Sequence, residues 1–354
     1  SESDIDTAPT ATSTATATSD VGTAAISTSA GSDNNYSIVS VDGTLTINKA
    51  TLTATAENKS RSYGDANPAF TISYTGFKGS DTVSGIDTTP TVSSTATGTT
   101  NVGSAVITTA GGSDNNYTFS TVNGTLTINK ATLTATADGK SREYGDANPS
   151  FTISYSGFKG SDSESDIDTA PTATSTATAT THVGTATIST LTGSDNNYTI
   201  VAVDGTLTIN KATLTATADD KTKEYGEANP AFTISYSGFK GSDSESDIDT
   251  APTATSTATA TTDVGTATIS TSTGSDNNYS IVSVDGTLAI GQATLRATAD
   301  AKTKVYGEAN PAFTISYSGF KGSDSESDID TAPTASSTAS TTTDVGTEVI
   351  ATSA

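Results

Sequence analysis

Short stretches in which apolar residues alternate with Thr or Ser recur along the whole chain. The clearest lies at residues 131–137, where Leu133, Ala135 and Ala137 alternate with threonines. Such alternation is typical of a strand that buries one face. Similar stretches cover residues 151–155 and 184–188, and none has the spacing of an amphipathic helix. The pattern predicts an all-β fold of short strands.

A pair of such stretches surrounds the dipeptide Asp204-Gly205. Asp-Gly suits a two-residue type I′ turn between antiparallel strands. The sequence therefore predicts a hairpin over residues 197–209, with Ala202 opposite Leu207. About six or seven strands then form a small antiparallel β-sandwich of immunoglobulin-like type.

The whole pattern repeats every 81 residues without an insertion. The run Tyr-Gly-Asp/Glu-Ala-Asn-Pro begins at Tyr63, Tyr144, Tyr225 and Tyr306, each 81 residues after the one before. A fixed period is the sequence signature of an array of similar modules. One period is long enough to form a small domain with its own core.

The phase of the alternation changes between neighbouring modules. Inward positions are odd-numbered before the segment Asn210-Lys211-Ala212 and even-numbered after it. A change of parity means that one sheet ends and another begins. The predicted domains are 50–130, 131–211 and 212–292. Residues 1–49 and 293–354 then form partial repeats, the C-terminal and N-terminal parts of a module respectively.

The segment Asn210-Lys211-Ala212 is a short connection between neighbouring domains. Its shortness predicts stiff junctions and an extended rod of tandem domains. We interpret the chain as an excerpt from a longer array, because it begins and ends within a module.

Composition narrows the classes of function. The 354 residues carry a net charge of −23 and contain no Cys. Nucleic acid is therefore not an expected partner, since phosphate binding needs basic patches. Thiolate chemistry and disulfides are excluded, and the sequence has no run of 18 apolar residues for a membrane span.

Acidic residues recur in one segment of the repeat. In the third repeat, four carboxylates stand at alternate positions, and in the fourth the segment recurs unchanged. They are Asp162, Glu164, Asp166 and Asp168, and then Asp243, Glu245, Asp247 and Asp249. In an extended segment they would share one side, where calcium could bind them. The second repeat lacks two of them, which favours a solvated loop. No cofactor is expected, with calcium as the alternative.

Other candidate sites have simpler explanations. His182 is the single histidine, and Asp20 and Asn101 are its equivalents, which indicates a surface loop. Asn197-Tyr-Thr matches the N-glycosylation pattern, although a turn-forming Asn before a core Tyr explains it better. Lys211 could form an isopeptide bond, but its equivalent is Gln292. Without a catalytic triad or zinc ligand set, we do not expect an enzyme.

The order of motifs resembles a known family. Tyr-Gly-Asp-Ala-Asn-Pro, Gly-Phe-Lys-Gly, Val-Gly-Thr-Ala-Thr-Ile, Asn-Asn-Tyr and Asp-Gly-Thr-Leu-Thr-Ile follow one another in each full repeat, with small variations. This order resembles the MBG-type bacterial repeat, an immunoglobulin-like module of very large surface proteins and adhesins. The resemblance covers the whole chain and implies secretion to the cell surface, in some members as gliding or biofilm adhesins. It provides no catalytic residues.

Three functions are consistent with these features. The favoured one is a structural stalk that projects a distant region of a giant bacterial adhesin or extracellular fibre, with neighbouring repeats as its partners. The second is a multivalent adhesive module that binds glycans or surfaces weakly in each repeat. Such a module needs an exposed aromatic patch, for which Phe158 is the plausible exposed residue. The third is a subunit that exchanges strands with other copies to form a filament.

Overall fold

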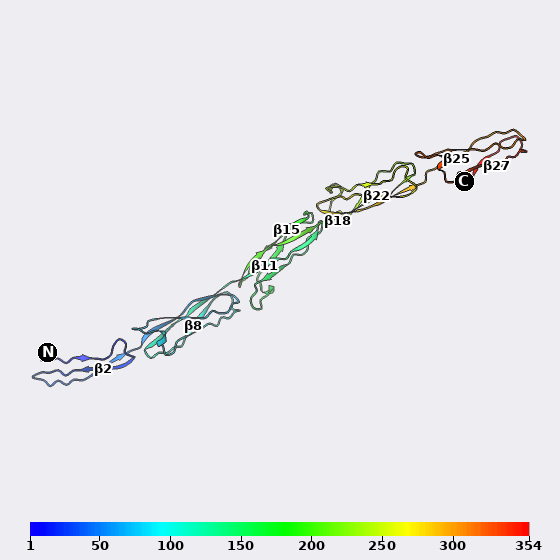
Figure 1. The fold of residues 1–354 in the computed structure, drawn as a ribbon. Coiled ribbons are helices and arrows are strands. Elements are labelled where there is room, and N and C mark those ends of the chain that lie inside the picture. Colours follow the sequence, from blue (N-terminus) through cyan, green and yellow to red (C-terminus); the bar gives the residue numbers. More distant parts are fainter. Residues whose placement is uncertain (354) are drawn as a thin grey trace. The chain divides into compact units, whose positions relative to one another are not determined.

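The computed structural model describes residues 1–353 and contains two compact units, whose strands are drawn as arrows in Figure 1. One unit comprises Ser1–Asp138, Phe151–Ser175 and Ile188–Gly205. The other comprises Gly139–Ser150, Thr176–Thr187 and Thr206–Ala354. The division runs through the third repeat, so the second repeat lies wholly in the first unit and the fourth in the second.

The second repeat contains two sheets. The three-stranded sheet has the order β6-β4-β9, with β6 (Ile72–Thr75), β4 (Ala50–Ala56) and β9 (Tyr117–Val122). The four-stranded sheet has the order β5-β10-β8-β7, with β5 (Lys59–Ser62), β10 (Gly124–Asn129), β8 (Gly103–Ala110) and β7 (Thr91–Ser93). A 3₁₀ turn, η2 (Val83–Gly85), precedes β7.

The other repeats use equivalent strands. In the fourth, the three-stranded sheet has the order β20-β18-β23, with β20 (Ile234–Ser237), β18 (Ala212–Ala218) and β23 (Tyr279–Val284). Its four-stranded sheet has the order β19-β24-β22-β21, with β19 (Lys221–Glu224), β24 (Gly286–Gly291), β22 (Gly265–Thr271) and β21 (Ala254–Thr255). In the third repeat, β11 (Ala131–Ala137) pairs with β13 (Ile153–Ser156) and β16 (Tyr198–Val203). There, β12 (Lys140–Glu143) pairs with β17 (Gly205–Asn210), and β14 (Thr172–Thr174) with the end of β15 (Gly184–Leu191).

The first and fifth repeats have fewer strands. The first contains η1 (Glu2–Asp4), β1 (Ala11–Thr12), β2 (Gly22–Thr28) and β3 (Gly43–Ile47). The fifth contains β25 (Arg296–Ala299), β26 (Ile315–Ser318), β27 (Thr334–Ser337) and β28 (Ile350–Ser353). The 3₁₀ turns η3 (Glu164–Asp166), η4 (Glu245–Asp247) and η5 (Glu326–Asp328) recur at one position of the repeat. Among residues 1–353, no helix is long and apolar enough to cross a membrane.

The core lies between the two sheets of a repeat. In the second repeat, Leu52 comes from the three-stranded sheet, and Ile107 and Leu126 come from the four-stranded sheet; all three are 0% exposed. In the third, Leu133, Ala135 and Ala137 are buried, as their alternation predicts. The all-β tandem fold is thus confirmed, and it rests on the two-residue period of strands.

The predicted hairpin is wrong. In the second repeat, β9 and β10 belong to different sheets, and in the third, β16 pairs with β11 while β17 pairs with β12. Ala202 therefore does not face Leu207 as a hairpin neighbour. These pairings are parallel, as are β4 with β9 and β10 with β5, so the sandwich is mixed rather than antiparallel.

The chain crosses between sheets where the turn was predicted. Neither Asn123 nor Gly124, the equivalents of Asp204 and Gly205, has the positive φ of a type I′ turn. A Cβ on Gly124 would lie 2.7 Å from the carbonyl oxygen of Ala56, so glycine permits a close backbone approach. The Asn123 Oδ1 accepts a 2.9 Å hydrogen bond from the backbone N–H of Thr109. Both residues thus have a role that does not involve a hairpin.

The change of parity between repeats is present. Strand β17 ends at Asn210 and β18 begins at Ala212, with Lys211 between them. Ile209 and Ala212 are 2% and 0% exposed. They belong to different sheets, because β17 pairs with β12 and β18 pairs with β20 and β23.

Candidate functional site

The candidate site is the junction between consecutive repeats, and it begins at the Tyr-Gly loop. In the third repeat this loop follows β12, and Gly145 has a φ of +82°, which favours glycine. The buried Arg142 donates a 2.9 Å hydrogen bond to Asn148 and a 2.5 Å bond to the carbonyl of Thr178. The backbone N–H of Tyr144 donates to the carbonyl of Asn210 at 2.8 Å. The loop is therefore held in place at the end of its own repeat.

Tyr144 projects from this loop into the fourth repeat. Its side chain is only 5% exposed, and its ring meets that of Tyr279 edge to face at 5.5 Å. Its hydroxyl donates to the Asp243 Oδ2 at 2.9 Å, and the Tyr279 hydroxyl donates to the same oxygen at 2.7 Å. Burial, and then the hydrogen bond to Asp243, raise the pKa of both tyrosines. Two phenols of neighbouring repeats thus share one carboxylate.

A lysine of the fourth repeat covers the glycine of the loop. A Cβ on Gly145 would overlap the aliphatic side chain of Lys240. The Lys240 Nζ also lies 2.9 Å from the Asp146 Oδ1. Because both groups are partly exposed, this ion pair contributes about 1 kcal/mol or less. The sequence Tyr-Gly-Asp therefore supplies a phenol, a flat backbone surface and a charge to the next repeat.

A second set of contacts at this junction involves His182 and Asn278, the equivalent of Asn197 in the glycosylation pattern. The Asn278 Oδ1 accepts a 3.2 Å hydrogen bond from the backbone N–H of Val183 in the third repeat. His182 is exposed, as predicted, but its Nδ1 lies 2.8 Å from the Asn278 Nδ2, and its ring is parallel to that of Tyr144. The turn before β23 is formed by Asp276, whose Oδ1 accepts from the N–H groups of Asn278 and Tyr279.

Lys211 also belongs to the junction. Its Nζ donates a 2.6 Å hydrogen bond to the backbone carbonyl of Asp276. This bond joins the connecting residue to the repeat that follows. The side chain thus meets a carbonyl oxygen, which cannot form an isopeptide bond.

The same contacts recur at the junction before the third repeat. Tyr63 is 6% exposed, its ring meets that of Tyr198 edge to face at 5.5 Å, and its hydroxyl is bonded to Asp162. The Lys159 Nζ lies 3.1 Å from the Asp65 Oδ1. Equivalent pairs join Tyr225 to Asp324 and Gly226 to Lys321 before the fifth repeat. The junction is therefore a repeated structure.

Comparison with protein families identifies the repeat. The family model described as MBG domain (YGX type) matches residues 2–46, 52–127, 133–208, 214–289 and 295–354. The chain belongs to the MBG domain family. Its Tyr-Gly-Asp and Tyr-Gly-Glu runs, which form the junctions, agree with the YGX description. No curated protein matches the chain.

The acidic segment of the MBG repeat is not extended. Residues 164–166 form the turn η3, where the Asp166 Oδ2 accepts from the backbone N–H of Ser163 at 2.8 Å. Asp162 accepts from the Tyr198 hydroxyl, and Asp168 from the backbone N–H of Asn196 at 2.9 Å. Asp243, Asp247 and Asp249 have the equivalent partners.

The carboxylates therefore do not share one side of an extended segment, because residues 164–166 form a turn and the three aspartates accept from different partners. Glu164 and Glu245 each begin a 3₁₀ turn. Across residues 1–353, no group of three or more His, Cys, Asp or Glu side chains is arranged to hold a metal ion. Calcium binding by this segment stays the alternative hypothesis to a solvated loop.

Chelation tests the calcium alternative. Because these aspartates already accept hydrogen bonds from the protein, we expect the thermal midpoint to be the same in excess calcium and in EDTA. Scanning calorimetry of the whole chain measures it, with magnesium as the control for ionic strength. A rise of several degrees in calcium alone would establish a calcium site.

The aromatic residue considered for surface binding is partly buried. Phe158 packs against Tyr155 and Tyr198, with ring centroids 5.6 and 5.9 Å away. It is half-buried, so it does not provide the exposed aromatic patch that an adhesive module would need. Its ring packs against Tyr198, the tyrosine that contacts Tyr63 of the second repeat.

Proposed function

We propose that this chain is a stalk segment of a large extracellular surface protein, which holds a distant functional region away from the cell. The observation that supports this function is the recurrence of one set of contacts at successive junctions. Stiff joints are what a stalk requires, and a catalytic protein would have no use for them at every repeat. The MBG family is a structural repeat type, which agrees with this role.

The junction contacts favour a fixed orientation of neighbouring repeats. In the first unit, the hydrophobic cluster of the second repeat continues through Tyr63 to Ala131, Leu133 and Tyr198 of the third. Continuous packing leaves little freedom for bending, because packed interiors resist deformation. If each junction adopts the same orientation, repetition produces length. The net charge of −23 would keep such stalks soluble and apart from one another.

Small-angle X-ray scattering tests the proposal. A compact protein of 354 residues would have a radius of gyration of about 20 Å. Four periods and part of a fifth, with about 30–40 Å for each full repeat and stiff joints, should give about twice that value or more. The scattering should also follow that of a rod. A value near that of a compact protein, or the curve of a freely jointed chain, would contradict the stalk.

A further inference from the structure

The chain enters each complete repeat along one segment and leaves it along another, and these two segments pair with each other. In the second repeat the chain enters through β4 and β5 and leaves through β9 and β10. All six residues of β9 pair in parallel with β4, and all four residues of β5 pair in parallel with β10. In both pairings the partners are 67 residues apart, as in Ala50 with Tyr117 and Lys59 with Leu126. The two strand pairs are therefore parts of one continuous pairing.

Backbone hydrogen bonds close both ends of this pairing. The N–H of Ala50 donates to the carbonyl of Asn116 at 3.0 Å, and the N–H of Tyr63 donates to the carbonyl of Asn129 at 2.8 Å. Equivalent bonds of 2.8 to 3.0 Å close the pairing in the third and fourth repeats. We name the paired segments the parallel clamp, which comprises residues 50–63 with 116–129 in the second repeat, 131–144 with 197–210 in the third, and 212–225 with 278–291 in the fourth.

A side chain bridges the parallel clamp where it crosses between the two sheets. In the second repeat, strand pairing is interrupted between β4 and β5, and there the Asn58 Oδ1 accepts a 2.7 Å hydrogen bond from the backbone N–H of Thr125. In the fourth repeat, the Asp220 Oδ1 accepts from the backbone N–H of Thr287, also at 2.7 Å. The residue at this crossing position therefore joins the two segments at the interruption.

The third repeat has glycine at the crossing position. Gly139 is the equivalent of Asn58 and Asp220, and it has no side chain that could bond to Thr206, the equivalent of Thr125. The φ of Gly139 is not positive, and a Cβ there would lie 3.6 Å from the carbonyl oxygen of Thr206, an ordinary contact. Neither space nor backbone conformation thus requires glycine, and its effect is the loss of the bridge.

The two ends of a parallel clamp lie at opposite junctions. In the second repeat, Asn116 at one end accepts a hydrogen bond from Val21 of the first repeat, and Tyr63 at the other end contacts Tyr198 of the third. The chain therefore enters at one end of the clamp and leaves at the other, and tension along the chain slides one segment past its partner. The evenly spaced bonds of a parallel pair then share the load and must break together. If both segments were pulled from the same end, the bonds would break one after another.

The connection between repeats holds no spare length. Strand β10 ends at Asn129 and β11 begins at Ala131, with Lys130 between them. The Lys130 Nζ donates a 2.6 Å hydrogen bond to the backbone carbonyl of Asp195 in the third repeat. Tension is therefore transmitted directly from one clamp to the next, and the chain lengthens only when a repeat unfolds.

We propose that the parallel clamps bear tension along the chain and that the crossing residue sets their strength, so that the third repeat yields first. This role rests on the proposed stalk function, because a stalk transmits the load on its distant region to the cell. An unfolded repeat of 81 residues spans at most about 290 Å, against about 30–40 Å when folded. Unfolding of the third repeat therefore adds about 250 Å of length while the second and fourth stay folded.

Stretching of the whole chain at constant force tests the relative strength of the clamps. The sequence contains no cysteine, so one cysteine added at each end attaches the chain specifically. We expect a step of about 250 Å for each complete repeat, and the step with the highest unfolding rate belongs to the third. Gly139→Asn should slow that step about fivefold, which is the effect of one added hydrogen bond.

Two further variants complete this measurement. Asn58→Gly should accelerate one of the slower steps about fivefold. It should fold, because the third repeat folds with glycine at this position. Thr172→Asn places the same side chain on β14, outside the clamp, and should change no step. If Gly139→Asn leaves the fastest step unchanged, the crossing residue does not set the strength of the clamp and the proposal is overturned.

A change in the direction of pulling tests the clamp itself. Thr51 and Thr118 are exposed register partners at the start of the clamp in the second repeat. In the variant Thr51→Cys/Thr118→Cys, with one handle on each cysteine, the same bonds are pulled apart one after another from one end. We expect this repeat to unfold at a several-fold lower force than when the chain is pulled from its two ends. Equal forces in the two directions would show that the parallel pairing bears no load, which contradicts the proposal.

These results are independent of the scattering test of the stalk. Scattering measures the shape of the unloaded chain, whereas stretching measures its resistance to force. A rod-like chain with weak clamps would overturn the tension-bearing role alone, and a freely jointed chain with strong clamps would contradict the stiff stalk alone.

Discussion

Replacing Leu126 by alanine is expected to destabilise the second repeat by about 2–5 kcal/mol. Leu126 lies in β10, the strand that pairs with both β5 and β8, and its side chain is 0% exposed. It belongs to one cluster with Ile107 and Ile128. Truncation removes buried apolar surface and leaves a cavity that rigid strands on both sides cannot close.

The chain provides its own control at Leu45. This residue occupies the same position of the repeat, but it is 39% exposed. Leu45→Ala should therefore change stability by about 1 kcal/mol or less. Hydrogen exchange followed by mass spectrometry resolves both, since 2–5 kcal/mol means roughly a thirtyfold or greater loss of amide protection in β8 and β10. Equal effects of the two substitutions would refute the assignment of the core to this position.

Burial on the strands could be predicted because the strand period is simple. Alternation alone identifies Leu133, Ala135 and Ala137 as core residues, and the change of parity identifies the end of a sheet at Asn210. Both inferences depend only on local geometry. They need no knowledge of which strand pairs with which.

Strand pairing could not be predicted in the same way. Asp204-Gly205 has the composition of a type I′ turn, and the strands on both sides have the correct alternation. The dipeptide instead allows the chain to cross between sheets, with glycine for close approach and Asn or Asp to bind a backbone N–H. Both uses need small and polar residues, so the sequence does not distinguish them.

The junction site was missed because its partners lie in different repeats. Tyr144 and Asp243 are 99 residues apart, and a tyrosine beside a strand is easily assigned to its own core. One signal was present: every full repeat contains a Tyr-Gly-acid run and a Phe-Lys-Gly run, which offer opposite charges. In an array, such complementary motifs can meet between neighbours as well as within one module.

Replacing Asp243 by alanine is the substitution with the largest expected effect on a junction. Two buried hydroxyls, of Tyr144 and Tyr279, donate to one oxygen of this residue, and these tyrosines are 5% and 3% exposed. Leaving both donors without an acceptor should cost about 2–6 kcal/mol, since one unsatisfied buried group costs about 1–3 kcal/mol. Amide protection should fall both around Tyr144 and at the start of β23.

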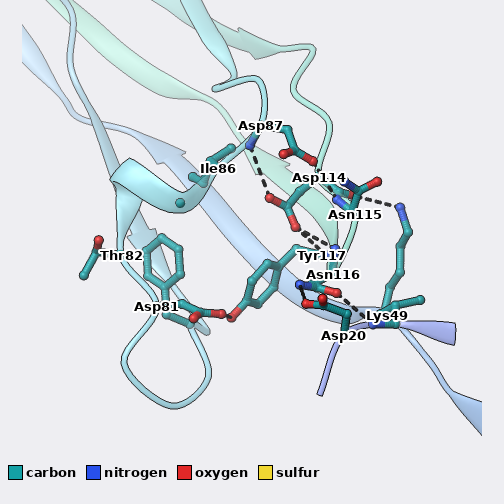
Figure 2. Close-up of a pocket in the computed structure, with 13 residues that line it drawn as sticks. Asp20, Lys49, Asp81, Thr82, Ile86, Asp87, Asp114, Asn115, Asn116 and Tyr117 are labelled. Carbon is teal, nitrogen blue, oxygen red and sulfur yellow. Dashed lines mark hydrogen bonds between the residues drawn. The ribbon is translucent and has the colours of Figure 1, made fainter. Parts of the chain in front are cut away.

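Asp81→Ala is the matched control, because Asp81, the equivalent carboxylate of the second repeat, accepts from the Tyr117 hydroxyl and meets no tyrosine of residues 1–49. Asp81 is exposed and lines a cavity of about 600 Å³ (Figure 2), where water can replace it. We expect about 1 kcal/mol or less for this substitution, measured by the same exchange experiment on β9. The difference between the two variants isolates the contribution of the tyrosine from the preceding repeat. If Asp243→Ala and Asp81→Ala reduce protection equally, that tyrosine adds no stability, and the junction owes its order to the Asn278 and Lys211 contacts instead.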